Sequence, residues 1–326
     1  MTNTNKTAIE KLEEVFDSRV IVYVTGERQP SNILATNVAL DIQLPFQEIL
    51  KSFGDDTKKI TLVLCTSGGN IDTPWPIVNA IRECCETFDV YILNKALSAG
   101  TLMALGADNI YMSKFAHLSP IDPSSNYVDG KGVQKKLEIE DTIGYIDFIK
   151  NKVGITEQNA LAELTKELTK EIEPTKLGSV NRTHALIRSV AKNLLELHVE
   201  PIEKRDQEDI ISHLTEKLYA HGHLINRKEA RKIGFDELIV DPTKEQDAAM
   251  DVFSIELETT LKQKEPFVPS AELLEGETEK DVIVTRGVVY SAEQKYHFNS
   301  YYKLTLVQAN PPNINMADTK SLWEKV

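Results

Sequence analysis

The sequence predicts an α/β fold in which parallel strands alternate with helices. Three observations favour it. Residues 60–112 follow the order strand, helix, strand, helix, strand. The strands are short, continuous apolar runs, as expected where both faces of a sheet are covered. Parallel neighbours also need a crossover between them, which the intervening helices supply.

The first elements of this fold precede that stretch. Thr7 to Phe16 predicts an amphipathic helix, because its apolar residues are spaced by three and four. Val20 to Val24 is a continuous apolar run and predicts a buried strand. After a polar loop, Pro45 to Phe53 predicts a second helix.

Two tight turns interrupt the regular part of the chain. Ile60 to Cys65 predicts a buried strand, and Ser67-Gly68-Gly69 predicts the turn after it. Two prolines mark the start of the next helix, since the first helical turn tolerates a missing N–H. The elements that follow are a strand over 90–93, a turn over 98–100, a helix over 101–106 and a strand over 109–112.

The rest of the chain predicts a helical insertion and a small β-rich unit. Charged segments with helix-spaced apolar residues extend over 133–220, and a helix and a strand over 227–240 return the chain to the sheet. We therefore expect an N-terminal helix over 1–17, a main domain over 18–245, a linker over 246–280 and a β-rich unit over 281–326. The linker is expected because its second half is acidic and contains two prolines.

Composition narrows the functional classes. The 326 residues carry a net charge of −13, which argues against a nucleic-acid-binding surface, because a phosphate backbone needs a basic footprint. The N-terminal segment has no apolar core of a secretory signal, and no run reaches the roughly 20 apolar residues of a membrane span.

The three cysteines, Cys65, Cys84 and Cys85, do not form a disulfide framework, since their number is odd and two are adjacent. They predict reduced thiols in a cytoplasmic protein. No Cys-x-x-Cys pair with histidine partners is present, and His221 with His223 lacks a third ligand, so no metal site is predicted.

The two tight turns are where we expect chemistry. Paired glycines can take positive φ and present bare N–H groups, which stabilise an oxyanion. Ser98 opens a helix, where the helix dipole favours a developing negative charge. Taken singly, Gly68-Gly69 is as well explained as a tight turn, and Ser98 as a helix N-cap. Both turns, however, follow consecutive parallel strands, where crevices open in α/β sheets, so a glycine amide and the Ala99 amide could flank a carbonyl attacked by Ser98.

At these residues the sequence resembles a known family. LVLCTSGGNIDTPWPIVNAIR and ALSAGTLMALGADNIYMSKFAHLSPIDP resemble the Clp-fold serine proteinases of the SDH (serine dehydrogenase proteinase) family. These are relatives of signal peptide peptidase A and of the Clp proteolytic subunit, in the crotonase-like superfamily. HGHLINRKEARKIGFDELIV looks like the closing helix-strand segment of the family. The resemblance implies a crotonase/Clp-like spiral of parallel β-α units and a serine endopeptidase.

The resemblance also implies roles for individual residues. Ser98 would be the nucleophile, and Gly68 or Gly69 together with Ala99 would supply the oxyanion hole. One departure concerns the first turn, which usually reads Pro-Gly-Gly in the family and has Ser67 here.

Three interpretations of the general base stay open. His221 could accept the proton with Asp122 orienting it, since a neutral imidazole does so near pH 7. A Ser–Lys dyad, as in signal peptide peptidase A, could instead use Lys131, Lys135 or Lys136. In the third interpretation no base is present and the chain is an inactive member of the fold.

We expect no cofactor, because acyl transfer of this kind needs none. By resemblance we expect a peptide or protein substrate, a homo-oligomer, and an ATP-dependent unfoldase or regulator as a further partner. Two other classes are open: a crotonase-type acyl-CoA enzyme, which uses the same two amides with a carboxylate base, and a non-catalytic interaction protein. Neither of them needs Ser98.

Overall fold

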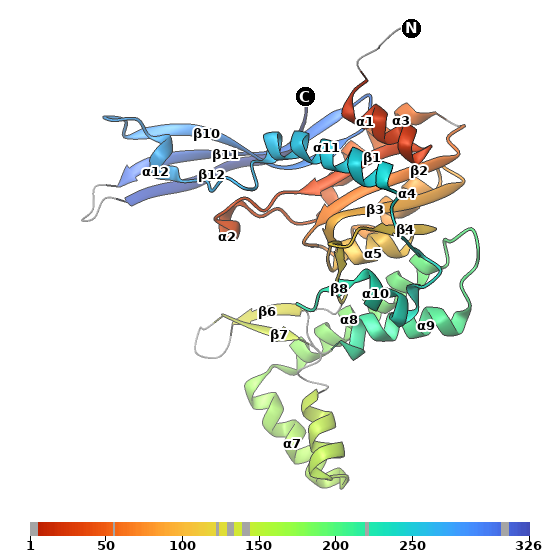
Figure 1. The fold of residues 1–326 in the computed structure, drawn as a ribbon. Helices are drawn as coiled ribbons and strands as arrows, with labels where there is room; N and C mark the ends of the chain where they lie inside the picture. Colours follow the sequence, from red (N-terminus) through yellow and green to blue (C-terminus); the bar gives the residue numbers. More distant parts are fainter. Residues whose placement is uncertain are drawn as a thin grey trace.

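The computed structural model describes residues 6–54, 56–121, 124–128, 134–138, 144–218, 222–307 and 313–326 (Figure 1). The helices used below are α1 (Ala8–Phe16), α2 (Ser31–Leu34), η1 (Leu40–Ile42), α3 (Gln43–Phe53), α4 (Pro74–Arg82), α5 (Ala99–Leu105), η2 (Phe148–Val153), α7 (Gln158–Glu171), α8 (Pro174–Leu195), α9 (Lys204–Ser212), η3 (His213–Lys217), α10 (Arg227–Ala230), η4 (Arg231–Phe235), α11 (Lys244–Leu261) and α12 (Pro269–Glu272). The strands are β1 (Arg19–Thr25), β2 (Lys59–Thr66), β3 (Thr87–Ala96), β4 (Asn109–Met112), β5 (His117–Leu118), β6 (Ser124–Val128), β7 (Gln134–Glu138), β8 (Ile225–Asn226), β9 (Ile239–Val240), β10 (Glu279–Tyr290), β11 (Lys295–Val307) and β12 (Asn313–Lys325).

One sheet passes through the part of the chain that the structure describes. Its strand order is β12-β11-β10-β1-β2-β3-β4-β9, with β5 beside β3 and β8 beside β5. Strands β1, β2, β3, β4 and β9 run parallel to their neighbours in this series. The predicted α/β class with parallel β-α units is confirmed, and the expected strands at 20–24, 60–65, 90–93 and 109–112 lie within β1 to β4.

Helices cover both faces of this sheet, which is why its central strands are buried along most of their length. On one face, α3, α4, α5 and the C-terminal half of α8 pack in the larger hydrophobic core. On the other face, α1 and α11 pack over β1, β2 and β3 in a second core. Figure 1 shows α1 and α11 side by side on that face.

The linker prediction is wrong for residues 246–261, which belong to α11. A capping box between Thr243 and Gln246 starts the helix, and it buries Met250, Phe253 and Leu257 against the second core. Its outer face also carries apolar residues, with Val252 56% and Ile255 68% exposed. Because apolar side chains occur all round the helix, the sequence does not show the one-sided pattern of a surface helix.

The expected helical insertion begins with a strand instead. Over residues 134–138 the chain forms β7, which pairs with β6 in a separate two-stranded sheet. Helices α7, α8 and α9 follow, as the charged and helix-spaced segments predict. Helix α8 anchors this segment, because its second half buries Ile187 and Leu194 in the larger core.

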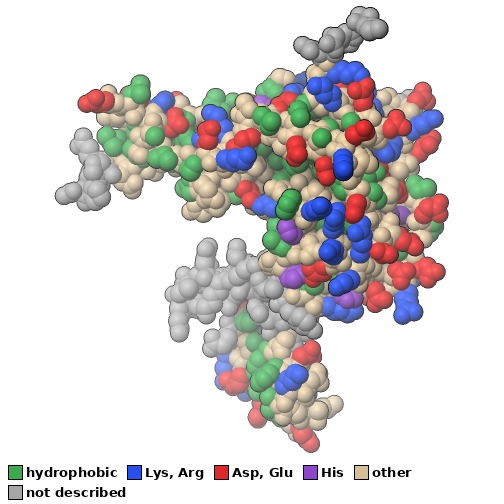
Figure 2. Space-filling model, in the orientation of Figure 1, with side chains coloured by type: hydrophobic (Ala, Val, Ile, Leu, Met, Phe, Trp, Pro, Cys, Tyr) green, Lys and Arg blue, Asp and Glu red, His purple; other side chains and the backbone are tan. Residues whose placement is uncertain are grey.

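The C-terminal strands β10, β11 and β12 join the main sheet. Strand β10 pairs antiparallel with β1, placing Val22 opposite Tyr290. Strands β10, β11 and β12 then extend as an arm away from α1 and α3 (Figure 1), and the space-filling view shows the same arm projecting from the body (Figure 2). The division of the chain into domains stays a prediction. Among the described residues, no helix is both long enough and apolar enough to cross a membrane.

Asp108 joins the helices of the larger core to β3. Arg82 at the end of α4 donates to both carboxylate oxygens, at 2.6 and 2.9 Å, and also to the carbonyl of Gly106. The backbone N–H groups of Phe88 and Val199 donate to the same carboxylate, each at 2.9 Å. Burial alone would raise the pKa of Asp108, but these hydrogen bonds outweigh it and lower the pKa.

We therefore expect Asp108→Asn to destabilise the fold by about 3 kcal/mol at pH 7, since Arg82 would keep a buried charge without its counter-ion. A lowered folded-state pKa contributes stability that is present above the unfolded pKa of about 4 and is lost as pH falls through the folded value. Urea unfolding at pH 7, 5 and 3 should show a constant gap between wild type and variant down to about pH 4, narrowing below it.

Asp241→Asn is the matched control, because Asp241 also pairs with arginines but is 53% exposed. Its substitution should cost less than about 1 kcal/mol. Equal costs for the two variants would contradict the role given to Asp108.

Candidate active site

Ser98 lies between the end of β3 and the start of α5 in a strained conformation, with φ 50° and ψ −110°. Asp17 and Lys262 also have positive φ, but both cap helices in the left-handed helical region. Among the described non-glycine residues with positive φ, Ser98 alone lies outside that region. Such a conformation costs about 1–3 kcal/mol and persists only where the surroundings impose it.

The Ser98 hydroxyl does not cap the helix that it precedes. It accepts no hydrogen bond from the first amides of α5, and it has no hydrogen-bond partner among the described residues. Ser98 is half-buried as a residue. The ordinary interpretation of Ser98 as an N-cap is therefore not supported, because its hydroxyl accepts no hydrogen bond from the start of α5.

The diglycine turn touches the Ser98 turn. Gly68 has φ +91°, and a Cβ placed on it would lie 2.5 Å from the carbonyl oxygen of Leu97 and 2.9 Å from the Cβ of Ser98. Only a residue without a side chain fits between the two turns, because a Cβ does not approach a backbone oxygen that closely. The two turns that follow β2 and β3 thus meet at one point at the carboxyl ends of these strands.

The amides of the two turns differ in their availability. The Gly68 N–H donates to Oγ1 of Thr66 at 3.0 Å, so it is already paired. The N–H groups of Gly69 and Ala99 have no acceptor among the described residues. Of the two glycines considered for the oxyanion hole, Gly69 therefore has the N–H without an acceptor among the described residues, while Gly68 lies between the two turns.

Thr66, which the sequence analysis did not single out, connects the two turns. Its carbonyl accepts the Leu97 N–H at 3.0 Å, and its Oγ1 accepts the Gly68 N–H. Thr25 on β1 donates to the same Oγ1 at 2.9 Å. Because Thr66 is fully buried at the end of β2, these bonds fix both turns relative to the sheet.

Two buried hydroxyl residues, Ser119 and Thr101, fix the backbone at Ser98. The Ser98 N–H donates to Oγ of Ser119 at 2.8 Å, and the Ser119 N–H donates to Oγ1 of Thr101 at 3.1 Å. Thr101 in turn lies 2.8 Å from the carbonyl oxygen of Ala96. Ser119 opens the Ser-Pro-Ile-Asp-Pro stretch, so the motif that carries the family resemblance also holds the turn that contains Ser98.

Ser67, where the family usually has proline, has its own anchor. Its hydroxyl donates to the carboxylate of Glu27, which also pairs with Lys95 on β3. The turn is therefore tied to the segment after β1 and to the neighbouring strand.

The structure does not describe the side chains of the predicted general bases. His221, Asp122 and Lys131 are not among the described residues. Lys135 and Lys136 lie on β7, opposite Tyr127 and Asn126, and only their backbone register is described. The segment that follows His221 does return to this edge of the sheet, since β8 pairs with β5, and β5 pairs with the end of β3 just before Ser98.

His223 is paired within its own segment. Its Nε2 lies 2.7 Å from the carboxylate of Glu229. Among the described residues, no group of three histidines, cysteines or acidic residues could hold a metal ion.

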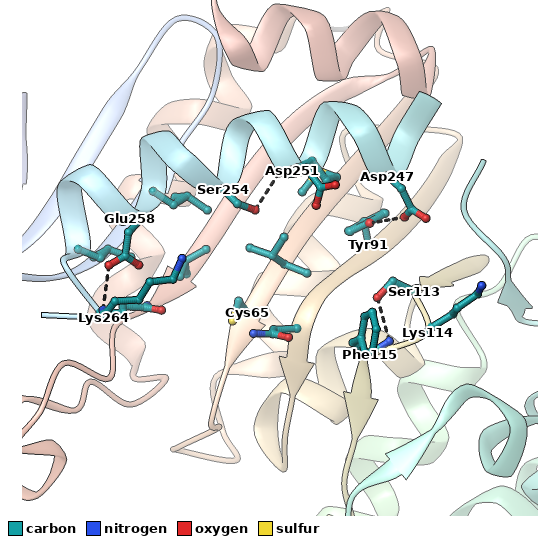
Figure 3. A pocket seen from close by; sticks show the side chains of 17 residues that line it. Cys65, Tyr91, Ser113, Lys114, Phe115, Asp247, Asp251, Ser254, Glu258 and Lys264 are labelled. Carbon is teal, nitrogen blue, oxygen red and sulfur yellow. Dashed lines mark hydrogen bonds between the residues drawn. The ribbon is translucent and has the colours of Figure 1, made fainter. Parts of the chain in front are cut away.

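A cavity of about 490 Å³ lies on the opposite face of the sheet, between α11 and the strand ends (Figure 3). Cys65, Tyr91 and Phe115 line one side of it, and Asp247, Asp251 and Glu258 of α11 line the other. Tyr91 donates to Asp247 at 3.0 Å, and burial raises the pKa of the Cys65 thiol. Ser98 is not part of this lining, so the cavity is separate from the candidate active site.

The fold is thus an α/β sheet in which the turn after β2 and the Ser98 turn after β3 meet, with the Ser98 hydroxyl and the Gly69 and Ala99 amides unpaired among the described residues. Residues 2–149 match the family of ClpP-like SDH-type serine proteinases. Over these residues the match confirms the family that the motifs predicted.

Two uncharacterized proteins of Methanocaldococcus jannaschii are similar in sequence. One is 24% identical over 192 residues, covering 58% of this chain and 58% of the relative. The other is 31% identical over 167 residues, covering 47% of this chain and 56% of the relative. The chain thus matches little more than half the length of these relatives.

Solved structures with a similar arrangement have low identity. A variant of the 1510-N membrane-bound stomatin-specific protease, in complex with a substrate peptide, is 18% identical with a TM-score of 0.38, covering 64% of this chain and 73% of that one. ClpP1 from Listeria monocytogenes is 15% identical with a TM-score of 0.37, covering 72% and 98%. A probable enoyl-CoA hydratase/isomerase from Mycobacterium abscessus is 16% identical with a TM-score of 0.31, covering 69% and 67%.

The contact between the turns makes Gly68 sensitive to any side chain. We expect Gly68→Ala to destabilise the protein by at least about 3 kcal/mol, since the new Cβ meets backbone atoms that cannot move independently. Gly154→Ala is the control: its φ of 82° and ψ of 22° lie in the left-handed helical region, but nothing lies within 4 Å of the added Cβ. It should cost only the conformational penalty of about 1–2 kcal/mol. Thermal unfolding of both variants measures the difference, and similar losses would contradict the contact between the turns.

Proposed function

We propose that this protein is a serine endopeptidase in which Ser98 is the nucleophile. The observation that carries the proposal is the strained backbone of Ser98 in a turn that contacts the diglycine turn, where the Ser98 hydroxyl and the Gly69 and Ala99 amides have no hydrogen-bond partner among the described residues. The match of residues 2–149 to a serine proteinase family supports the same class of reaction.

In the proposed reaction, Ser98 Oγ attacks the carbonyl carbon of a peptide bond, and its proton passes to the general base. The Gly69 and Ala99 N–H groups donate to the oxyanion of the tetrahedral intermediate; one such donor contributes about 10²–10³ in kcat in comparable sites. The base then protonates the leaving amine. Water hydrolyses the acyl-enzyme in the reverse sequence and regenerates Ser98.

The supports of the site suit this role. Buried Thr66 and Ser119 accept hydrogen bonds from the backbone of both turns, so the donors are fixed before a substrate binds. Donors that do not reorganise during the reaction are the most effective for oxyanion stabilisation. Ser98 is half-buried, and its backbone N–H is held by the Ser119 hydroxyl.

For the base we favour His221 with Asp122 orienting it, and we keep Lys135 or Lys136 as the alternative. The register β8–β5–β3 supports His221, because the chain four residues after His221 pairs with β5, which in turn pairs with the end of β3 just before Ser98. We also propose a cytoplasmic location and a homo-oligomer with a peptide or protein substrate. An ATP-dependent unfoldase or regulator stays a prediction.

A fluorophosphonate probe tests the nucleophile. We expect it to label the wild-type chain at Ser98, and Ser98→Ala to abolish the label with less than about 1 kcal/mol change in stability, since the hydroxyl makes no internal hydrogen bond. Ser119→Ala is the comparison variant. If Ser98→Ala kept the label and Ser119→Ala lost it, Ser98 would not be the nucleophile. A wild-type chain that never reacts, with or without peptide substrate, would favour the inactive interaction protein.

The base is tested by hydrolysis rates. We expect His221→Ala to lower kcat by about 10²–10⁴-fold, as for loss of a general base, and the wild-type rate to fall as pH drops below about 6.5. His213→Ala is the control, since His213 is half-buried and, among the described residues, its ring bonds to the Asp209 carbonyl one helical turn earlier. Full activity of His221→Ala together with loss in Lys135→Ala or Lys136→Ala would replace the triad by a Ser–Lys dyad.

A further inference from the structure

Strand β12 is a long edge strand with no strand on its outer side. It has 13 residues and is the last member of the series β12-β11-β10-β1 among the described residues. Figure 1 shows it along the arm that leaves the body of the molecule. An edge of this length presents a row of unpaired N–H and C=O groups, which natural proteins usually shorten or cover.

A bulge in the middle of β12 controls where its side chains point. Tyr301 pairs with Lys320 and Tyr302 with Asp318, so Thr319 is one residue in excess. Because alternate residues of a strand point to opposite faces, the residues paired with the even positions of β11 share one face. That face carries Met316 and Trp323, although seven positions separate them in sequence. Ala317 and Leu322 lie on the other face.

This pattern makes the strand complementary to itself. Consider two copies of β12 paired antiparallel, with the bulge of each strand at the centre of the pairing. Residues that lie directly opposite each other then belong to the same face of the strand. Met316 then lies opposite Trp323 of the second copy, and Ala317 lies opposite Leu322 of the second copy. The polar residues also oppose each other, with Asn315 facing Glu324 and Asp318 facing Ser321.

The pairing of apolar residues favours this register over its neighbours, and its charges are compatible with it. No two like charges are directly opposite, whereas like charges in that position destabilise a sheet. Shifting the register by two residues would set Leu322 against Asn315 and Met316 against Ser321. Met316, Leu322 and Trp323 are only half-buried in the single chain, so pairing would remove apolar surface from water.

We propose that β12 pairs with β12 of a second copy of this chain, which joins two sheets into one across a two-fold axis. This proposal names the surface through which the proposed homo-oligomer forms, and it rests on that part of the proposed function. It does not involve Ser98, and an inactive chain would assemble in the same way.

Cross-linking tests the register in the full chain. We expect the double variant Ala317→Cys/Leu322→Cys to form a covalent dimer under mild oxidation, because residues directly opposite each other have Cβ atoms within reach of a disulfide. The wild-type chain, with Cys65, Cys84 and Cys85, is the control for background cross-linking. Dimers in Asn315→Cys/Leu322→Cys instead would overturn the proposed register.

Sedimentation velocity tests the β12 surface with variants that need no introduced cysteine. We expect Leu322→Glu to lower the fraction of dimer at least tenfold, and Ala317→Lys added to Leu322→Glu to restore it through a cross-strand ion pair. Circular dichroism checks that both variants stay folded.

The outcomes separate the two claims. An oligomer unchanged by Leu322→Glu would overturn the β12 surface while leaving self-assembly intact. A wild-type chain that stays monomeric at every concentration would overturn both. Fluorophosphonate labelling of the same samples reports on the active site independently.

Discussion

The arrangement of the site depends on one close approach of backbone to backbone. The backbone of Gly68 lies so close to Leu97 and Ser98 that a Cβ atom on Gly68 would not fit between them. Because the two turns end neighbouring parallel strands, the sheet itself brings them together, and the hydroxyl of Thr66 sets the remaining distance. Ser98, with its strained backbone, lies at that contact. The site is therefore a property of the β2–β3 edge rather than of any single loop.

Much of this was predictable from the sequence because strong local signals coincide there. Buried parallel strands leave continuous apolar runs such as 60–65, and tight turns leave glycines and small residues at the strand ends. These two signals predict the fold class and the meeting of Ser98 with the diglycine turn. The family match over residues 2–149 agrees with the same stretch.

Other features have no comparable signal. Thr66 and Ser119 are ordinary hydroxyl residues in the sequence, and their importance arises only when folding places their oxygens beside distant amides. Helix α11 was missed because apolar residues occur on its buried and its exposed faces alike, which removes the helical period. The hairpin of β6 and β7 lies in a charged segment where strand and helix preferences are weak.

The substitution at Ser67 has a consequence for how the turn behaves in solution. A proline at that position would stiffen the backbone by its ring, which no solute can alter. Here the same turn is held by a hydroxyl–carboxylate bond whose acceptor, Glu27, is also half of an ion pair with Lys95. Both charged side chains are about one-third exposed, so dissolved electrolyte screens their attraction. The rigidity of this turn thus depends on ionic strength, a dependence that relatives with proline at this position would lack.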